Sequence, residues 1–300
     1  MNEHGQVMSV LTGKNVLIVG GDARYFELMK QLILYDASVY AIGFDDATDD
    51  IDGVVLTTEQ NIDHHLFDVV ILPISGVDDK GNVDTHFRRP AIKLTHDWFG
   101  HFTKECIIFT GIVTSFLKQL ERQHANVMAL MDRDDIAIYN SIPTAEGAVM
   151  LAIQHTDVTI HDANVVILGY GRVGKTLVNT FQGLGAQVSV YARQKRDLAR
   201  IYEAQAQPIT DEQLLSSIEG ADLLINTIPK LIVTPEMIRV LPTSCFILDL
   251  ASKPGGVDFR FAKKRGIEAM LAPSLPGLVA PKTAGKMLAH VIQTVVQDDK

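Results

Sequence analysis

One stretch near the middle of the chain restricts the possible fold more than any other. An apolar run of strand type begins at Asn164, ends in a glycine-rich turn and continues directly as a helical pattern. The turn consists of Gly169, Tyr170, Gly171, Arg172, Val173 and Gly174. In such a turn the first glycine permits a tight bend, the second lets backbone approach a pyrophosphate, and the third lets the helix pack close to the strand. Because a strand precedes this turn and a helix follows it, the stretch predicts a Rossmann dinucleotide site rather than a turn without a ligand.

Apolar runs of strand type alternate with helical patterns along both halves of the chain. The runs cover residues 15–21, 38–44, 53–58, 68–73 and 106–111, and then 164–171, 187–193, 223–229, 245–252 and 267–274. Continuous apolar strands separated by helices indicate parallel sheets that are covered on both faces. A length of 300 residues suits two such domains. We therefore expect an α/β fold of two tandem doubly wound parallel-sheet domains, the second being the Rossmann domain.

Two helical patterns are expected to link these domains by crossing between them. The first starts at Pro143, with Thr144 as a suitable N-cap and Glu146 in the first turn. The second covers residues 283–297, follows the last strand, and is free to return to the first domain. This places a flavodoxin-like substrate domain at residues 1–142 plus 282–300, and the cofactor domain at residues 143–281.

The end of the second strand in the cofactor domain decides between NAD and NADP. NAD-binding units carry an acidic residue there for the ribose hydroxyls. This chain has Ala192 and Arg193, followed by Lys195 and Arg196. No side chain at this place accepts from a 2′-hydroxyl, whereas cations are available for a 2′-phosphate, so we predict NADP. For Lys195 and Arg196 the alternative is that they only begin an exposed helix.

The order of motifs in the second half is similar to the cofactor domain of 2-hydroxyacid dehydrogenases. Loop residues expected beside the cofactor are Thr227, Ile228, Pro229, Ala251 and Ser252. At the place of the substrate-binding arginine of those enzymes the chain has Ser252 and Lys253, and Ser274 replaces their catalytic histidine. The acid/base that ketone–alcohol interconversion requires is therefore missing, which excludes that reaction.

Four motifs resemble a narrower family, the A subunits of dipicolinate synthase. They are "PISG", "PTAEGAVMLAI", "DLASKPGGVDF" and "LAPSLPGLVAPKTAG". The resemblance runs essentially end to end, although Leu278 occupies a place where a basic residue is expected in many relatives. It implies NADP-dependent oxidation of a dihydrodipicolinate-type intermediate to pyridine-2,6-dicarboxylate during sporulation. It also implies that the partner is the flavoprotein-like B subunit of dipicolinate synthase, and that the protein lies in the mother-cell cytoplasm.

A dicarboxylate substrate needs cations or hydrogen-bond donors. Lys253, beside the expected nicotinamide position, and Lys282, at the start of the returning helix, are the candidate cations. Ser274, Ser75 and the backbone of Gly76 are the candidate donors. The alternative is that these lysines are solvated and that the serines cap turns. Formation of an aromatic ring supplies much of the driving force, so such a site mainly has to orient its substrate.

Composition excludes several other classes of protein. The net charge of −9, with both signs spread along the chain, argues against nucleic acid or an acidic membrane as partner. No apolar run is expected to reach membrane-spanning length. Cys106 and Cys245 are expected to be buried free thiols of a cytoplasmic protein. None of the histidines has metal-ligand spacing, including the group His64, His65, His86, His96 and His101, and we predict no metal site.

Two further hypotheses keep the nucleotide site but change the function. A scaffold or sensor that binds NADP and positions a partner would need no cationic substrate site. Another NADP-dependent amino- or imino-acid dehydrogenase would keep both sites and change the substrate. In each case we expect a homo-oligomer. Four questions stay open at this point: the general base, whether the chain turns over by itself, the oligomeric state, and the surface that contacts the partner.

Overall fold

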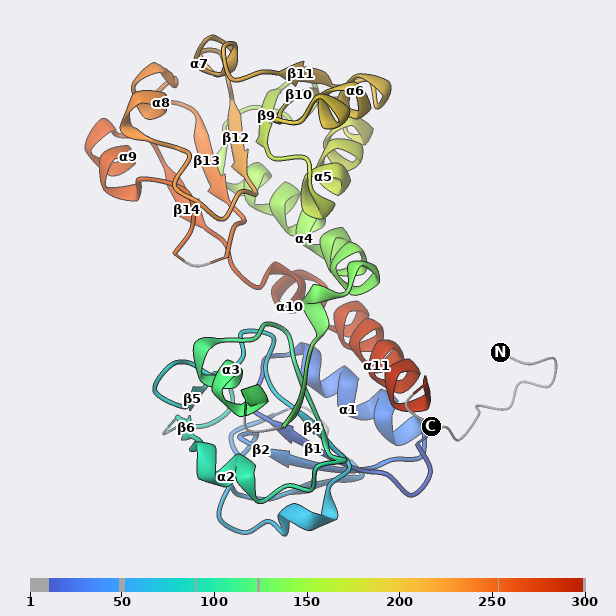
Figure 1. Ribbon diagram of the computed structural model, residues 1–300. Coiled ribbons are helices and arrows are strands. Elements are labelled where there is room, and N and C mark those ends of the chain that lie inside the picture. The colour runs from blue at the N-terminus through green and yellow to red at the C-terminus, as the bar shows by residue number, and fades with distance from the viewer. Residues whose placement is uncertain (1–10, 49–51, 90, 123–124, 253, 299–300) are drawn as a thin grey trace, which may run out of the picture. The chain divides into compact units, whose positions relative to one another are not determined.

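The computed structural model describes residues 11–48, 52–89, 91–122, 125–252 and 254–298 (Figure 1). The chain forms two compact units. Unit 1 comprises Met1–Tyr139 and Ala280–Lys300, and unit 2 comprises Asn140–Val279. The chain thus passes between the units at residues 139/140 and 279/280, where the sequence analysis expects residues 142/143 and 281/282.

Unit 1 is built on a six-stranded parallel sheet. Its strands are β1 (Asn15–Val19), β2 (Ser38–Ile42), β3 (Val54–Leu56), β4 (Val69–Ile71), β7 (Ile107–Thr110) and β8 (Asn126–Ala129). Their order across the sheet is β3-β2-β1-β4-β7-β8, and all neighbouring pairs are parallel. This is the 3-2-1-4-5-6 order of a Rossmann fold, not the 2-1-3-4-5 order of a flavodoxin. The expectation of a flavodoxin-like domain is therefore corrected.

Helices cover both faces of this sheet, which explains why its strands are apolar without interruption. They are α1 (Arg24–Leu34), α2 (His96–Gly100), α3 (Ser115–Arg122) and α11 (Pro281–Asp298). Val16 and Ile18 of β1 pack in the core with α1 and α11, whereas Leu17 between them packs in the core with α2 and α3. A short antiparallel hairpin of β5 (Asn82–Val83) and β6 (Ile92–Lys93) is added to the unit.

The helix that follows the second unit returns to the core of unit 1. Helix α11 lies beside α1 (Figure 1) and buries a stripe of apolar residues there: Leu288, Ala289, Val291, Ile292, Val295 and Val296. A Cβ at Gly285 would overlap the carbonyl oxygen of Arg24, so the two helix backbones are in close contact. Because Arg24 begins α1 directly after β1, the first turn of α11 lies near the carboxyl edge of the sheet.

Unit 2 repeats the same topology. Its strands are β9 (Asn164–Leu168), β10 (Gln187–Tyr191), β11 (Gln207–Ile209), β12 (Leu223–Asn226), β13 (Phe246–Asp249) and β14 (Ala269–Leu271). The sheet order is β11-β10-β9-β12-β13-β14, again 3-2-1-4-5-6. The connecting helices are α5 (Arg172–Gly183), α6 (Lys195–Glu203), α7 (Leu214–Ser217), α8 (Pro235–Val240), α9 (Phe259–Arg265) and α10 (Leu275–Val279). The second domain is thus a Rossmann domain, as the glycine-rich turn predicts.

Helix α4 (Asp134–His155) contains the first passage between the units and starts earlier than expected. Pro143 lies inside this helix and does not begin it, and the Thr144 hydroxyl donates to the Asn140 carbonyl at 2.7 Å instead of capping. The predicted helix start is therefore wrong. Pro143 has no N–H to donate to the carbonyl of Tyr139, and Tyr139 is the residue at which unit 1 ends.

Helix α4 also differs from the expectation that no apolar run reaches membrane-spanning length. One 18-residue window of it has a mean hydropathy of 1.3, so α4 is long and apolar enough to span a membrane. Length and composition alone are weak evidence, since core helices share them. Ala145, Ala148, Leu151 and Ala152 of α4 pack in the core of unit 2, which accounts for much of its apolar character.

Candidate functional site

The glycine-rich turn adopts the conformation that its sequence predicts. Gly169 has φ +102°, and a Cβ there would lie 2.5 Å from the Thr227 hydroxyl oxygen. A Cβ at Gly174 would overlap the Gly169 carbonyl oxygen, so this glycine allows the helix to approach the strand. A Cβ at Gly171, by contrast, would meet no atom of the chain within 4 Å. The fold itself therefore requires Gly169 and Gly174, while space beside Gly171 stays open to solvent at the N-terminus of α5.

The corresponding turn of unit 1 is closed by the chain itself. There β1 is followed by Gly20 and Gly21, and the Gly21 N–H donates to the Asp84 carbonyl at 2.9 Å. A Cβ at Gly20 would lie 2.6 Å from the same oxygen. Asp84 follows the short strand β5, so the hairpin of unit 1 covers the place that a pyrophosphate would occupy. Of the two turns, the one in unit 2 fits a dinucleotide.

The end of β10 presents a cation rather than an acid. Ala192 is buried, and Arg193 is exposed and makes no hydrogen bond or ion pair within the described part of the chain. Asp211, which follows the neighbouring strand β11, accepts a hydrogen bond of 2.5 Å from the Tyr191 hydroxyl. Burial, followed by this hydrogen bond, raises the pKa of Tyr191 to about 12. Asp211 is thus held by a neutral phenol.

Lys195 and Arg196 occupy the first turn of α6, and both are exposed. Arg196 lies 3.6 Å from Asp197. This placement agrees with an exposed helix start, the alternative considered for these two residues, so only Arg193 belongs to the strand end itself.

The predicted loop residues meet at one edge of the unit 2 sheet. Thr227, Ile228 and Pro229 follow β12, the neighbour of β9, and both the amide and the hydroxyl of Thr227 donate to the Leu168 carbonyl. Ala251, which is buried, and Ser252, which is exposed, follow β13. The carboxyl ends of parallel strands face the same edge, where doubly wound sheets bind ligands. Lys253 lies outside the described residues.

Ser274 has a strained backbone. It is exposed, lies between β14 and α10, and has φ +61°, in the left-handed region. Its carbonyl accepts from the Gly277 N–H at 3.1 Å. A residue with a Cβ in this region is destabilised relative to glycine, and such strain is found at functional sites more often than elsewhere.

Ser274→Gly is expected to stabilise the protein by about 0.5–1 kcal/mol, since glycine removes the left-handed strain and loses part of that gain through unfolded-chain entropy. Denaturant unfolding monitored by circular dichroism measures the difference. Ser244→Gly is the control, because Ser244 is an exposed turn residue without a positive φ. A loss of stability in both variants would contradict the strain at Ser274.

The two candidate donors of unit 1 differ in availability. Ser75 is exposed in the turn after β4. The Gly76 N–H, however, already donates to the Pro73 carbonyl at 2.9 Å, and Gly76 is buried with φ +75°. The prediction that the Gly76 backbone binds substrate is therefore corrected. Lys282 is exposed in the first turn of α11, on the carboxyl side of the same sheet.

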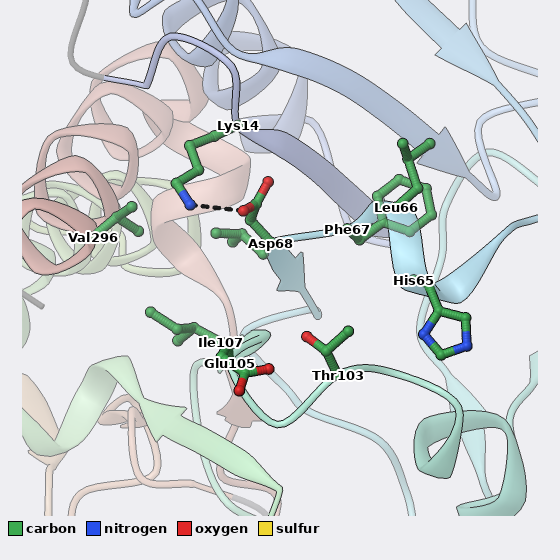
Figure 2. Close-up of a pocket in the computed structure, with 10 residues that line it drawn as sticks. Lys14, His65, Leu66, Phe67, Asp68, Thr103, Glu105, Ile107 and Val296 are labelled. Atoms are coloured by element: carbon green, nitrogen blue, oxygen red, sulfur yellow. Dashed lines mark hydrogen bonds and ion pairs between the residues drawn. The ribbon is translucent and has the colours of Figure 1, made fainter. Parts of the chain in front are cut away.

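A cavity of about 250 Å³ lies in unit 1 at the opposite, amino edge of the sheet (Figure 2). Lys14 precedes β1 and forms an ion pair of 2.6 Å with Asp68, which precedes β4. Glu105 and Val296 also line the cavity. Ligands of doubly wound sheets bind at the carboxyl ends of strands, and none of the predicted site residues lines this cavity.

The cysteines and histidines supply no alternative chemistry in the described part of the chain. Cys106 and Cys245 are buried and free, which confirms the prediction, and burial raises the pKa of each thiol to about 12. Neither therefore forms a thiolate nucleophile at neutral pH. No group of three or more His, Cys, Asp or Glu side chains among the described residues is placed to hold a metal ion.

The sequence analysis missed one pair of buried polar residues in unit 2. Asn226 and Asp249 are fully buried at the ends of β12 and β13. The available signal was that each ends an otherwise apolar strand with a polar side chain.

Comparison with known proteins agrees with this geometry. Residues 15–131 match the N-terminal domain of the dipicolinate synthase A subunit, and residues 137–298 match the alanine dehydrogenase/PNT C-terminal domain. The latter is a dehydrogenase-type domain, which implies a nicotinamide cofactor. The A subunit of dipicolinate synthase from Bacillus subtilis (strain 168) is 43% identical over 290 residues, which are 96% of this chain and 98% of that protein.

Solved structures show the same relationship. The crystal structure of the dipicolinate synthase A subunit from Bacillus halodurans has a TM-score of 0.90 and 47% identity, and the match covers 95% of this chain and 98% of that one. A transhydrogenase from Sinorhizobium meliloti shares the fold at 15% identity, with a TM-score of 0.66 and coverage of 94% of each chain. From its glycine-rich turn, its two Rossmann-type sheets and these matches over nearly its whole length, the chain belongs to the family of dipicolinate synthase A subunits.

Proposed function

We propose that this chain is an NADP-dependent oxidoreductase that converts a dihydrodipicolinate-type intermediate to dipicolinate, as the A subunit of dipicolinate synthase in sporulation. The observation that carries the proposal is the open phosphate turn at Gly171 beside a strand end that carries Arg193 and no acid. Membership of the family of dipicolinate synthase A subunits supports this choice of reaction. A bound NADP would supply the hydride acceptor for this oxidation, and the loss of a hydride and a proton would leave the ring aromatic.

The residues of unit 2 have defined tasks in this proposal. The backbone at Gly171 and the N-terminus of α5, at Arg172 and Val173, bind the pyrophosphate through N–H groups and the helix dipole. Arg193 binds the 2′-phosphate as a charge-assisted donor. Thr227, which contacts the phosphate turn, holds the loop after β12 against the cofactor.

The substrate carries two carboxylates, which need cations or donors wherever water is excluded. In unit 1 we assign Lys282 and the Ser75 hydroxyl to this task, because both are exposed and belong to the carboxyl side of the sheet. In unit 2 we assign Ser274 and Lys253. Each of these side chains would donate to a carboxylate or neutralise its charge, and no histidine is required, because loss of the proton is favoured by aromatisation.

The family name also suggests assembly and location. The Bacillus relatives are named as A subunits, which implies a second kind of subunit in the enzyme. We propose that this chain acts with a B subunit in the mother-cell cytoplasm. We further propose that it forms a homo-oligomer, which light scattering of the purified chain measures.

Lys282→Met is expected to weaken dipicolinate binding to the NADP-saturated chain by about tenfold, since one charge-assisted contact is lost. NADP affinity should stay unchanged. Methionine keeps the apolar stem of the side chain, so altered packing would not explain a loss. Calorimetric titration, once with dipicolinate and once with NADP, measures both affinities.

Lys286→Met is the matched control, because Lys286 is exposed one turn later on the same helix and lies 3.8 Å from Glu27. It should leave dipicolinate binding nearly unchanged. Equal binding by the parent and both variants would remove Lys282 from the substrate site. A chain that binds NADP but no dipicolinate at all would favour the scaffold or sensor function.

A further inference from the structure

Asn226 and Asp249 form a buried polar pair between neighbouring strands of unit 2. They lie opposite each other in the register of β12 and β13, and both are fully buried. Nδ2 of Asn226 donates to Oδ1 of Asp249 at 2.8 Å. Buried polar groups are costly unless they are paired, so a carboxyl group kept at the end of a core strand calls for an explanation.

The carboxyl group of Asp249 also holds the loop that follows β13. Its Oδ1 accepts from the Ala251 N–H at 3.1 Å, and its Oδ2 accepts from the Gly256 N–H at 2.6 Å. All three groups that bond Asp249, including the Asn226 amide, are donors. Only a side chain whose two oxygens both accept satisfies this arrangement, which describes a carboxylate and not an amide.

The other member of the pair holds the loop that follows β12. Oδ1 of Asn226 accepts from the Ile228 N–H, and Nδ2 also donates to the Ile228 carbonyl, both at 3.0 Å. A Cβ at Gly256 would overlap Nδ2 of Asn226 and lie 2.5 Å from the Lys230 carbonyl oxygen. The two loops are thus packed against each other around the pair.

The contacts continue to the phosphate turn. Thr227, next to Asn226, donates to the Leu168 carbonyl at 2.9 Å through its hydroxyl, the same hydroxyl that limits the space at Gly169. An unbroken series of contacts therefore runs from the phosphate turn to Asp249, and from Asp249 to the backbone on both sides of residue 253.

We propose that Asp249 is a positioning residue that fixes the backbone at Ala251 and at Gly256, and with it the start of the loop after β13, relative to the bound dinucleotide. This inference rests on the proposed function, because it places Ala251 and Ser252 beside the bound cofactor. Asp249 itself is fully buried, and its two oxygens are engaged by Asn226, Ala251 and Gly256. Its effect is confined to orientation, where a displacement of the reacting groups by about 1 Å can cost about a hundredfold in rate.

Asp249→Asn tests the inference. The amide nitrogen of the new side chain is a donor, and it would face a group that itself donates: the Asn226 amide, the Ala251 N–H or the Gly256 N–H. We expect kcat for NADPH formation to fall about a hundredfold, the cost of misplaced reacting groups. The Kd for NADP should change by less than about threefold, well under the effect of one charged contact. Amide hydrogen exchange at Ala251 and Gly256 should become faster, independently of turnover.

Asp222→Asn is the matched control. Asp222 lies at the amino end of the same sheet, and its carboxylate accepts from the Asn164 N–H at 2.8 Å. This variant should lose a similar backbone contact and some stability without a fall in kcat. An equal fall in both variants, or a kcat for Asp249→Asn close to that of the parent, would overturn the inference.

Two outcomes separate this inference from the proposed function. A parent chain that forms no NADPH would refute the proposed function, while unchanged exchange at Ala251 and Gly256 in Asp249→Asn would refute the inference in either case. If Asp249→Asn does not fold, Asn226→Ser removes one of the three bonds to Asp249. Asn226→Ser should then also lower kcat, and an unchanged kcat in this variant would refute the inference.

Discussion

Gly171→Val is expected to abolish NADP binding while unit 2 remains folded. Gly171 is the N-cap of α5 with φ −81°, a conformation open to any residue, and a side chain there would meet no atom of the protein within 4 Å. The branched side chain would instead occupy the approach of the pyrophosphate to the backbone. We expect a loss of affinity of more than about a hundredfold, or more than about 2.7 kcal/mol, measured by calorimetric titration together with a thermal melt.

Gly183→Val is the control for this substitution. Gly183 ends the same helix, and a Cβ there would likewise meet no atom within 4 Å. NADP should bind this variant as it binds the parent. Binding retained by Gly171→Val would show that the phosphates bind elsewhere, and melting of the variant far below the control would show that Gly171 has a structural role.

Arg193→Ala is expected to remove most of a preference for NADP over NAD. The parent should bind NADP about tenfold to a hundredfold more tightly, because a charge-assisted contact to the 2′-phosphate contributes about 1.5–3 kcal/mol. Asp211, the nearby acidic residue, is engaged by the Tyr191 hydroxyl. Parallel titrations with NADP and NAD measure the ratio of the two affinities.

Arg200→Ala serves as the control, because Arg200 is exposed on α6 and pairs with Glu203. It should leave the ratio intact. A parent that binds NAD and NADP equally would refute the assignment of the cofactor. An unchanged ratio in Arg193→Ala would transfer the role to Lys195 or Arg196, in the first turn of α6.

In the two six-stranded sheets the sequence analysis missed β8 and β11, which each lie at an edge, as do the recognised strands β3 and β14. It also missed the two short strands of the hairpin, β5 and β6. β8 has no fully buried residue, and β11 contains Pro208 and has one. Edge strands lack the continuous apolar character that burial on both faces imposes. The expected flavodoxin-like order of unit 1 is overturned by β3, which pairs with β2 at the edge of the sheet and not with β1.

The features that the sequence predicted correctly depend on local interactions, and those that it missed depend on contacts between distant segments. The phosphate turn was predictable because it lies within one strand–turn–helix segment, in which Gly174 is constrained by the Gly169 backbone and Gly169 by Thr227. The start of α4 was not, since Pro143 suits a first turn, and only the packing of α4 in unit 2 shows that the helix continues through it. The Asn226–Asp249 pair depends on a hydrogen bond between neighbouring strands. The polar residue at the end of each apolar strand is visible in the sequence, but its partner is not.

The measurement that tests the central claim most directly is the formation of NADPH by the purified full-length chain. The chain is incubated with NADP and a freshly prepared dihydrodipicolinate-type substrate, in the presence and in the absence of a B subunit, while NADPH and dipicolinate are followed in parallel. We predict that both products appear in equal amounts, that they require this chain, and that NAD supports the reaction more slowly than NADP. Dipicolinate formed without NADPH, or no NADPH even when the B subunit is present, would contradict the account.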